Sequence, residues 1–349
     1  MRAALWLVLF GVACKQGDSD SSRERDTAPD TADSGDDSWT GEMPPTVSQV
    51  RSYVMACAIL TRGGVACFGA FSWSDTHSGR DYQEISQPTS GVCGISAGAI
   101  DCWALSDSAY SEEALTNDGL VGWPTGSDWL QVERSADNNC ARDTAGRISC
   151  WGYSFTPDSH EDTRFEVPTS AGWQDIAMAQ KCELCALDVT GTVTCFPAPW
   201  QKEAGSCAAR PFGETRYVDI DAKNNQLVGL RADGSVDMTY DIRAEDGSDY
   251  YRSARSGYRQ ATGEGNITCG ITQTGSLDCW AHDREHFDDS PLERDAAKFE
   301  GTYVDVDLAG ETLWGIDSEG QLHWNQHDRT DDGYISFWEA VGVPNPDDF

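Results

Sequence analysis

The residues of this chain best suited to chemistry are its thirteen cysteines, because a thiol can form a disulfide, bind a metal or act as a nucleophile. Ten of them form five pairs that are nine or ten positions apart: Cys57 with Cys67, Cys93 with Cys102, Cys140 with Cys150, Cys185 with Cys195, and Cys269 with Cys279. Two further stretches, Val228 to Met238 and Trp314 to Trp324, keep this frame with apolar residues at both ends. Such regular repetition favours a structural role for the thiols.

Each stretch is predicted to be a β-hairpin. If Cys140 lies opposite Cys150, the pairing leaves a three-residue loop that ends at Gly146. In such loops the last residue usually adopts the left-handed conformation, which favours glycine. The full-length stretches all have glycine at this position, and the short stretch leaves the two-residue loop Ala97-Gly98. The cysteines should therefore face each other, close enough for disulfides.

Three cysteines remain, namely Cys14, Cys182 and Cys207. Without Cys14 the cysteine number is even, which fits an oxidising compartment, and Cys182 is paired with Cys207 by elimination. Cys182 and Cys185 also have the spacing of a redox motif. Cys185 is better explained by pairing with Cys195.

The N-terminus predicts export. Arg2 precedes the eleven-residue apolar run Ala3–Ala13, which is too short to span a bilayer and is typical of a signal peptide at residues 1–13. The segment Gly11-Val-Ala-Cys14 resembles a bacterial lipobox. That resemblance implies lipid attachment at Cys14 and an outer-membrane lipoprotein of the bacterial envelope, facing the periplasm or the exterior. A secreted protein is the alternative. Residues 14–45 are predicted to form an acidic disordered linker.

Residues 328–339, Asp-Arg-Thr-Asp-Asp-Gly-Tyr-Ile-Ser-Phe-Trp-Glu, resemble the calcium-binding loop of an EF-hand. The resemblance implies side-chain ligands at Asp328, Thr330, Asp332 and Glu339 and a carbonyl ligand at Tyr334. The alternative is an acidic loop between repeats, followed by a strand. Calcium is the only cofactor that the sequence suggests.

Two patterns typical of enzymes are better explained by the repeat. Gly94-Ile-Ser-Ala-Gly98 matches a nucleophile elbow, which requires a strand-to-helix turn, but it spans a predicted hairpin turn. His282 and His286 have a zinc-peptidase spacing, which requires both on one helical face, but their segment follows a predicted strand. No catalytic residue is predicted, and the chain is interpreted as non-enzymatic.

The elements that position these residues recur about every 43 residues. Before each hairpin an aromatic residue precedes an aliphatic one by three positions: Tyr82 with Ile85, Trp129 with Val132, Trp173 with Ile176, Tyr217 with Ile220, Tyr258 with Ala261, and Tyr303 with Val306. The first copy has Val47 and Val50 instead. Each of the seven units therefore offers three strands and room for a fourth, and no long stretch has helical periodicity.

The pattern Cys-Ala-Leu-Asp-x-x-Gly-x-Val-x-Cys at residues 185–195, and Trp151-Gly152 after Cys150, resemble the regulator-of-chromosome-condensation repeat. That family forms seven-bladed β-propellers, so the resemblance implies an all-β, seven-bladed propeller with hairpin disulfides over residues 46–349. The common Gly-Gln-Leu-Gly segment after Trp-Gly is missing. The family includes nucleotide-exchange factors, enzyme inhibitors and ubiquitin-ligase domains, so the resemblance implies no single activity.

The chain has 58 acidic and 25 basic residues and a net charge of −33, which disfavours binding to nucleic acid or anionic lipid. We interpret it as an envelope-anchored, monomeric binding scaffold for a protein partner. Aromatic residues dominate interface hot spots, so the candidate contacts are Phe71, Trp73, Trp123 and Trp200. The alternatives are a surface lectin that binds carbohydrate through the same aromatic residues, and a hydrolase with its site in the central channel.

Overall fold

The computed structural model divides into two compact units, Met1–Glu42 and Met43–Phe349. The residues that it describes are 47–52, 56–61, 63–69, 72–77, 80–86, 91–104, 123–135, 138–152, 168–179, 183–196, 216–223, 226–239, 250–252, 255–264, 267–281, 299–309, 312–330 and 333–341. The predicted signal peptide and linker, with Cys14, lie outside these residues. So do Cys182 and Cys207, whose pairing stays a prediction.

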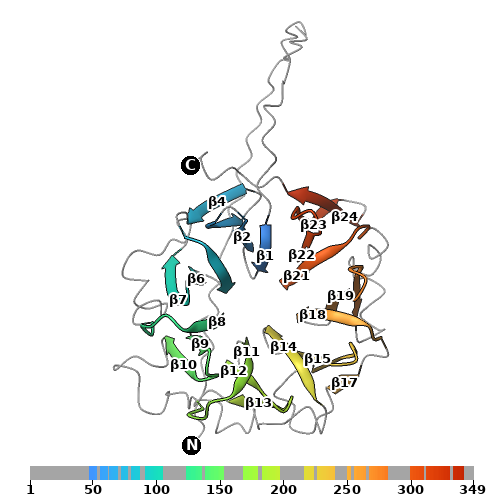
Figure 1. Cartoon of the computed structure of the whole chain (residues 1–349). Helices are drawn as coiled ribbons and strands as arrows, with labels where there is room; N and C mark the ends of the chain where they lie inside the picture. The colour runs from blue at the N-terminus through green and yellow to red at the C-terminus, as the bar shows by residue number, and fades with distance from the viewer. Residues whose placement is uncertain are drawn as a thin grey trace, which may run out of the picture. The chain divides into compact units, whose positions relative to one another are not determined.

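Seven antiparallel sheets follow one another along the second unit and stand around a common centre (Figure 1). The first three sheets contain β1 (Val47–Ser52), β2 (Ala56–Leu60), β3 (Val65–Gly69) and β4 (Ser72–His77); β5 (Tyr82–Ser86), β6 (Gly91–Ser96) and β7 (Ala99–Ala104); and β8 (Trp129–Arg134), β9 (Asn138–Asp143) and β10 (Ile148–Gly152). The next two contain β11 (Trp173–Ala179), β12 (Glu183–Asp188) and β13 (Val193–Phe196); and β14 (Tyr217–Lys223), β15 (Gln226–Arg231), β16 (Val236–Thr239) and β17 (Tyr250–Arg252). The last two contain β18 (Tyr258–Glu264), β19 (Ile267–Thr272) and β20 (Leu277–Ala281); and β21 (Tyr303–Ala309), β22 (Thr312–Asp317), β23 (Leu322–Thr330) and β24 (Gly333–Val341). We call the sheets blades 1 to 7, and their first three strands inner, middle and outer. The predicted seven-bladed propeller is confirmed.

The hairpins between middle and outer strands have the predicted register. Cys140 lies opposite Cys150, and the turn glycine Gly146 has φ +73°. A Cβ atom on Gly146 would lie 2.6 Å from the backbone nitrogen of Trp173, so the turn needs glycine for space as well as for conformation. In the short hairpin, Ala97 and Gly98 both have positive φ, as a two-residue turn requires. The five predicted hairpin disulfides are present, Cys57–Cys67, Cys93–Cys102, Cys140–Cys150, Cys185–Cys195 and Cys269–Cys279.

The two hairpins without cysteine keep the same opposed positions. Val228 lies opposite Met238, and Trp314 opposite Trp324 with stacked rings 5.2 Å apart. Buried apolar side chains form seven clusters, each shared by two neighbouring blades. The core of the propeller is therefore a ring of blade-to-blade contacts.

The ring closes between blades 7 and 1. In blades 3 to 7, the N–H of the inner strand's first residue donates to the turn-glycine carbonyl of the preceding blade, for example Tyr217 to Gly191 at 2.9 Å. The N–H of Val47 donates in the same way to Gly320 at 2.9 Å. Strand β1 thus contacts blade 7 in the way that the inner strands of blades 3 to 7 contact the blade before them, and this contact closes the ring.

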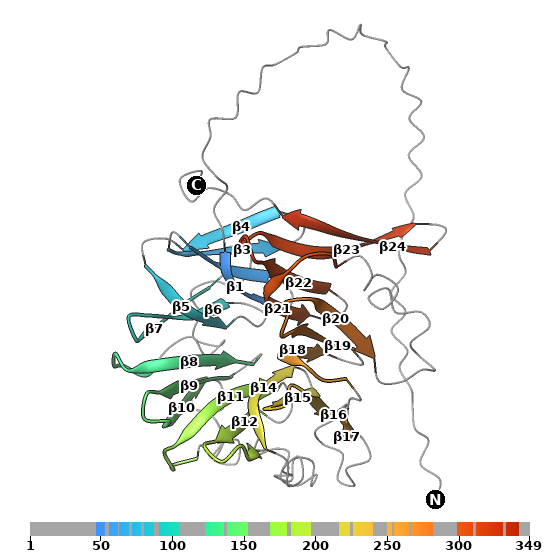
Figure 2. The same cartoon turned by 45° about the vertical axis from the view of Figure 1, so that its right-hand side comes forward.

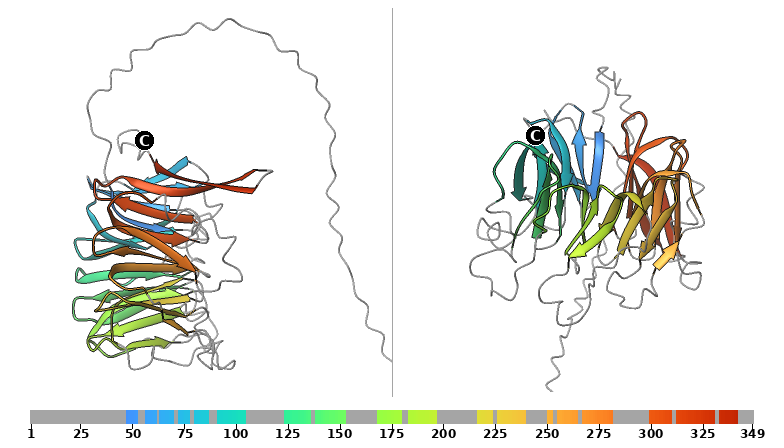
Figure 3. Two further views of the ribbon diagram at one scale, coloured as in Figure 1. Left: turned by 90° about the vertical axis from the view of Figure 1, so that its right-hand side faces the viewer. Right: turned by 60° about the horizontal axis from the view of Figure 1, so that its bottom comes forward.

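Fourth strands occur in blades 1, 5 and 7, where β4, β17 and β24 pair with the outer strands. In the other blades the corresponding segments lie outside the described residues. Hairpin β23–β24 has nine residues in each strand and reaches beyond the other blades (Figures 2 and 3). Within the described part of the chain, no helix is long and apolar enough to cross a membrane.

Three blades share a tyrosine–glycine–aspartate arrangement. In blade 6 the ring of Tyr258 lies over Gly270, where a Cβ atom would come within 2.8 Å of the ring. The hydroxyl of Tyr258 donates to Asp278 on the outer strand at 2.6 Å. The equivalent sets are Tyr82, Gly94 and Asp101 in blade 2 and Tyr217, Gly229 and Asp237 in blade 5. In the blades that begin with Trp129 and Trp173, alanine replaces the glycine.

Candidate binding site in the central channel

All seven inner strands contain a β-bulge at their second residue, counted from the first residue of each strand. A bulge re-aims one side chain out of the regular alternation. The second residues are all exposed, and we call them the bulge ring: Ser48, Gln83, Leu130, Gln174, Val218, Arg259 and Val304. The next residues form a third-position ring of amides and carboxyls: Gln49, Glu84, Gln131, Asp175, Asp219, Gln260 and Asp305.

The third-position side chains bond the next blade around the circle. An inner strand pairs with its middle strand along one edge only, and buried N–H groups on the free edge need another acceptor. Gln49 accepts from the N–H of Ile85 at 3.0 Å. Asp175 accepts from the N–H of Ile220 at 2.9 Å. Asp305 does the same across the closure, and accepts from the N–H of Val50 at 2.8 Å.

The fifth residues of the inner strands form a second level. Asp307 accepts from the hydroxyl of Ser52 at 2.9 Å and is ion-paired with Lys223 from blade 5. Asp221 accepts from the N–H of Gly263 at 3.4 Å. The two levels together link neighbouring blades around the ring, and the Lys223–Asp307 pair also joins blades 5 and 7, which are not neighbours.

A cavity of about 410 Å³ lies between these levels. Its lining spans the depth of the inner strands, from Arg259 in the bulge ring to Ser135 and Lys223 at the far ends of their strands. The volume falls within the usual range for ligand pockets. Carboxyl, amide and hydroxyl groups share the lining with the basic side chains Arg51, Arg134, Lys223 and Arg259, so the cavity is polar and carries charges of both signs.

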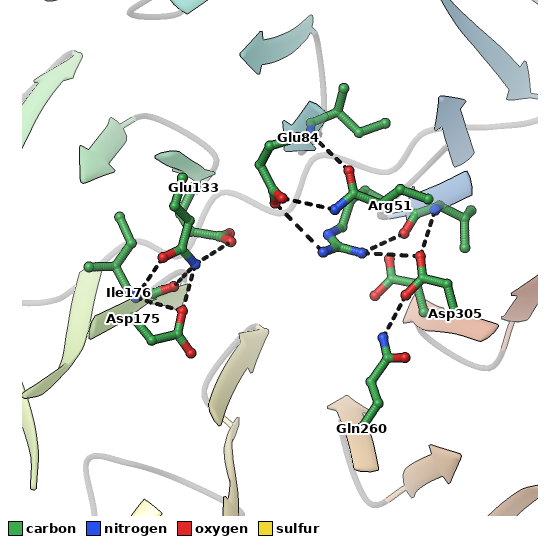
Figure 4. A network of polar contacts seen from close by, with 12 residues as sticks. Arg51, Glu84, Glu133, Asp175, Ile176, Gln260 and Asp305 are labelled. Atoms are coloured by element: carbon green, nitrogen blue, oxygen red, sulfur yellow. Dashed lines mark hydrogen bonds and ion pairs between the residues drawn. The ribbon is translucent and has the colours of Figure 1, made fainter. Parts of the chain in front are cut away.

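On one side of the channel the carboxyls are matched by a cation. The guanidinium of Arg51 lies between Glu84, at 3.7 Å, and Asp305, at 3.5 Å (Figure 4). Burial alone lowers the pKa of Arg51, but Asp305 and Glu84 outweigh burial and raise that pKa above its ordinary value. Burial raises the pKa of Glu84, and Arg51 and Gln49 hold that rise down.

On the other side of the channel lie four carboxyls from blades 3 to 5. We call them the acidic wall: Glu133, Asp175, Asp219 and Asp221. None of the four is ion-paired with any residue that the structure describes.

Burial raises the pKa of Glu133 well above its ordinary value. Burial, the charge of the neighbouring Asp175 and a hydrogen bond with it raise the pKa of Asp219 well above its ordinary value. Burial also raises the pKa of Asp221. Arg51 lowers the pKa of Glu133 and of Asp219, and Lys223 lowers that of Asp221, so these cations hold the rises down.

The residues predicted as partner contacts lie elsewhere. Trp123 is half-buried and packs against the cluster between blades 2 and 3. Trp73 belongs to β4, opposite Phe68, while Phe71 and Trp200 lie outside the described residues. The contact role of all four aromatic residues stays a prediction.

The segment that resembles an EF-hand is divided between two paired strands. Asp328 and Thr330 belong to β23, and Tyr334 and Glu339 belong to β24, while Asp332 lies outside the described residues. Asp328 lies opposite Ile335, whereas Glu339 lies opposite Trp324. A calcium loop would have to replace this hairpin register, so calcium binding stays a prediction. Among the described residues, no group of three acidic, histidine or cysteine side chains is placed to hold a metal ion.

The third-position ring escaped the sequence reasoning, although a signal for it exists. In every repeat that begins with an aromatic residue, the residue two positions later is Asp, Glu or Gln: Glu84, Gln131, Asp175, Asp219, Gln260 and Asp305. Only the convergence of the inner strands shows that these polar residues meet in one channel.

No family model and no curated protein sequence matches the chain. Solved structures do match. The CRINKLY WD40 ectodomain of the Arabidopsis thaliana receptor kinase ACR4 has a TM-score of 0.54 at 14% identity, over 86% of this chain and 99% of that one. Human WBSCR16 has a TM-score of 0.54 at 11% identity, over 78% and 85% of the two chains. Prp20p of Saccharomyces cerevisiae has 0.50 at 13% identity, over 75% and 77%.

At these identities the likeness shows the fold alone. The neighbours are propellers of the regulator-of-chromosome-condensation and CRINKLY kinds, and the repeat pattern predicted the first of these. The structure of Prp20p was described together with its binding to Gsp1p and histones. The chain is thus an all-β, seven-bladed propeller that resembles these proteins in architecture, with its own acidic channel at the centre.

Proposed function

We propose that the protein is a non-catalytic scaffold outside the cytoplasm that binds a protein partner through one face of its propeller. The observation that carries this proposal is the placement of exposed apolar surface. Among the described residues, four large aliphatic side chains are exposed: Leu130 at 51%, Val189 at 66%, Val218 at 53% and Val304 at 43%. Exposed apolar side chains gathered on one surface mark interaction sites.

All four belong to the face that carries the hairpin turns, which we call the turn face. Leu130, Val218 and Val304 follow the first residues of their inner strands, and those first residues bond the turns of the preceding blades. Val189 lies in such a turn, two residues before Gly191, whose carbonyl accepts from Tyr217. Val189 and Val218 are therefore neighbours on this face.

The turn face is also rigid. The carboxylate of Asp143 accepts from the N–H groups of Ala145 and Arg147 within its turn, and Asp188 and Asp317 cap their turns in the same way. Disulfides join the strands behind most of these turns. A preorganised surface loses little conformational entropy on binding, which favours affinity.

Disulfides in five blades support an oxidising compartment. Attachment to a bacterial envelope through lipid on Cys14 belongs to the proposal and is supported by the lipobox-like segment and the apolar run before it. Radiolabelled palmitate incorporated by the wild type but not by Cys14→Ser supports the anchor. Equal labelling, or no labelling of either, contradicts it.

The test of the binding function is affinity capture with the oxidised full chain on bacterial envelope and culture extracts, in calcium and in chelator. A protein captured stoichiometrically supports the proposal, and its loss in chelator implicates Asp328–Glu339. Retention of polysaccharide without protein supports the lectin alternative. Hydrolysis of a captured substrate supports the hydrolase alternative, for which the carboxyls of the acidic wall would be the first residues to replace.

A further inference from the structure

The hairpin of β23 and β24 ends blade 7 with an uncovered strand edge. Strand β24 is the last strand of its sheet, and no other strand of the described chain pairs with its outer edge. Strand β23 pairs with β22 only from Leu322 to Trp324, so among the described strands residues 326–330 have β24 as their one partner. The outer part of the hairpin is therefore a two-stranded ribbon that reaches beyond the other blades (Figures 2 and 3). Such a ribbon is marginally stable in water, and a third strand stabilises it.

The register shows which peptide groups face this edge. The N–H of Asp317 donates to Gln321, and positions along an antiparallel pair alternate between hydrogen-bonded and non-hydrogen-bonded. Trp314 and Trp324 therefore form a non-hydrogen-bonded pair, and Trp324 directs its peptide groups toward Glu339 of β24. By the same alternation, every second residue of β24 directs its N–H and C=O away from β23: Tyr334, Ser336, Trp338 and Ala340. A regular row of such groups is a template for pairing with another strand.

Strand β24 also lacks the features that normally keep an edge unpaired, which are shortness, bulges, proline and charge. It has nine residues and no proline, its register with β23 has no shift, and Glu339 is its only charged residue. The other fourth strands differ. Strand β17 has three residues, while β4 has six, pairs through a bulge and carries Asp75. The contrast favours β24 as a place where a strand is added.

We propose that β24 receives an extended segment of a partner protein, which pairs with its outer edge as a fifth strand of blade 7. Main-chain hydrogen bonds to the outward-facing residues supply affinity, and the alternating side chains of the segment supply specificity. This surface is the outer edge of a blade and not the turn face, so the inference goes beyond the proposed function and can fail without it.

Charge complementarity decides which extended segment fits. The chain has a net charge of −33, so two copies that pair edge to edge repel each other. A second copy is therefore disfavoured, and a segment that carries lysine or arginine at its ends is favoured. Its middle should consist of β-branched or aromatic residues, because cross-strand pairs of these types stabilise a sheet. Strand β24 offers such residues at five positions: Tyr334, Ile335, Phe337, Trp338 and Val341.

A displayed library of linear peptides as long as β24, selected on the oxidised full chain, tests the inference. We expect binders without proline, with β-branched or aromatic residues in the middle and basic residues at the ends. Binding should slow hydrogen exchange at least about tenfold at the outward-facing amides of Tyr334, Ser336, Trp338 and Ala340. A copy of the selected peptide that is methylated at every backbone nitrogen should not bind, because it has no N–H left to donate.

A proline at the edge locates the contact on the protein. Ser336→Pro removes one outward N–H and places a ring at the edge, so peptide binding should weaken at least about tenfold. The matched control is Thr76→Pro in β4, where the same alternation directs the N–H away from β3, and it should leave peptide affinity unchanged. Urea unfolding of both variants checks that each one is folded. If Ser336→Pro does not fold, the methylated peptide decides the question alone.

Recovery of no binders, unchanged exchange at the outward-facing amides, or undiminished affinity of the methylated peptide overturns the inference. So does equal affinity of a folded Ser336→Pro variant and the wild type. Dimerisation of the wild type that Ser336→Pro abolishes would assign the edge to a second copy and overturn the choice of partner. Capture of one protein from envelope extracts by wild type and Ser336→Pro alike would leave the scaffold function standing without this contact.

Discussion

At the scale of single residues, matched sets of three residues fix the packing of the strands within a blade. The ring of Tyr258 occupies the space in which a side chain on Gly270 would lie, and its hydroxyl reaches Asp278. The same three residue types occur together in blades 2 and 5. The aromatic residue that begins the inner strand and the small residue beneath it on the middle strand therefore vary as a pair: tyrosine with glycine, or tryptophan with alanine.

Gly270→Ala should lower the free energy of unfolding by about 1–3 kcal/mol, because the added methyl group overpacks against Tyr258. Urea unfolding of the oxidised protein measures the change. The control is Ala141→Gly in blade 3, which adds no atoms beneath Trp129 and should cost about 0.5–1 kcal/mol through backbone entropy alone. Equal stability of Gly270→Ala and wild type would contradict the steric account.

Two sets of carboxyls have pKa shifts of opposite sign: the pKa values are raised in the channel and lowered in the hairpin turns. Burial raises the pKa of Glu133 and Asp219, so their contribution to stability is complete below their unfolded pKa values of about 4 and is lost as pH rises. Burial opposes the ionised form of Asp143, Asp188 and Asp317 as well, but hydrogen bonds within their turns outweigh it and lower these pKa values. The turn aspartates therefore stabilise above about pH 4 and lose that effect as pH falls.

The protein should consequently be more stable near pH 5 than near pH 7.5, and less stable again below about pH 4. Urea unfolding across this range measures the profile. In Glu133→Gln with Asp219→Asn the loss between pH 5 and 7.5 should shrink, while the loss on the acid side remains. A double variant that keeps the full wild-type slope would show that the wall does not titrate in this window.

At the scale of elements, the middle–outer hairpin is the unit that the sequence predicts best. Its register, turn length and glycine depend on residues within eleven positions of one another, and local turn chemistry is strong. The EF-hand resemblance shows the limit of such local reading, since Asp328 and Glu339 fit the spacing while β23 and β24 pair them with other residues. Long-range pairing decided where that segment lies.

Blades 5 and 7 have apolar pairs where the other blades have disulfides, so they show which residues can replace the two cysteines. Cys269→Ala with Cys279→Ala should cost about 2–3 kcal/mol, because the short loop is no longer constrained in the unfolded chain. Cys269→Val with Cys279→Met copies the opposed pair Val228 and Met238 and should recover up to about 1 kcal/mol of that loss through cross-strand packing. Thermal unfolding of the three proteins under oxidising conditions compares them. A valine–methionine variant no more stable than the alanine variant would mean that the neighbouring blades do not accept the pair.

At the scale of the whole propeller, the fold follows from the repeat but the channel does not. Seven hairpins and their preceding aromatic residues predict seven blades, and the structure has them. The acidic wall draws its members from three blades about 45 residues apart, so it exists only once the ring is closed. The sequence shows that Asp, Glu or Gln recurs two positions after each of these aromatic residues. It does not show that these polar side chains meet in one channel.

Closure depends on side chains that join the two ends of the ring. Asp305→Ala should lower the free energy of unfolding by about 1–3 kcal/mol, since it leaves the N–H of Val50 without its acceptor and removes one of the two carboxylates beside Arg51. Hydrogen exchange should accelerate at Val50 in this variant and remain slow at Ile220, which bonds Asp175 between blades joined by the chain. Uniform acceleration in both places would indicate global loss of structure rather than opening at the seam.

The seam has a consequence for the order in which the protein can be made. Val50 and Leu60 of blade 1 are buried in one cluster with Trp314 and Ile316 of blade 7. The apolar face of blade 1 is therefore synthesised first and stays uncovered until blade 7 has been made. Until then that face is a site for chaperones or for aggregation, and blade 7 ends the exposure.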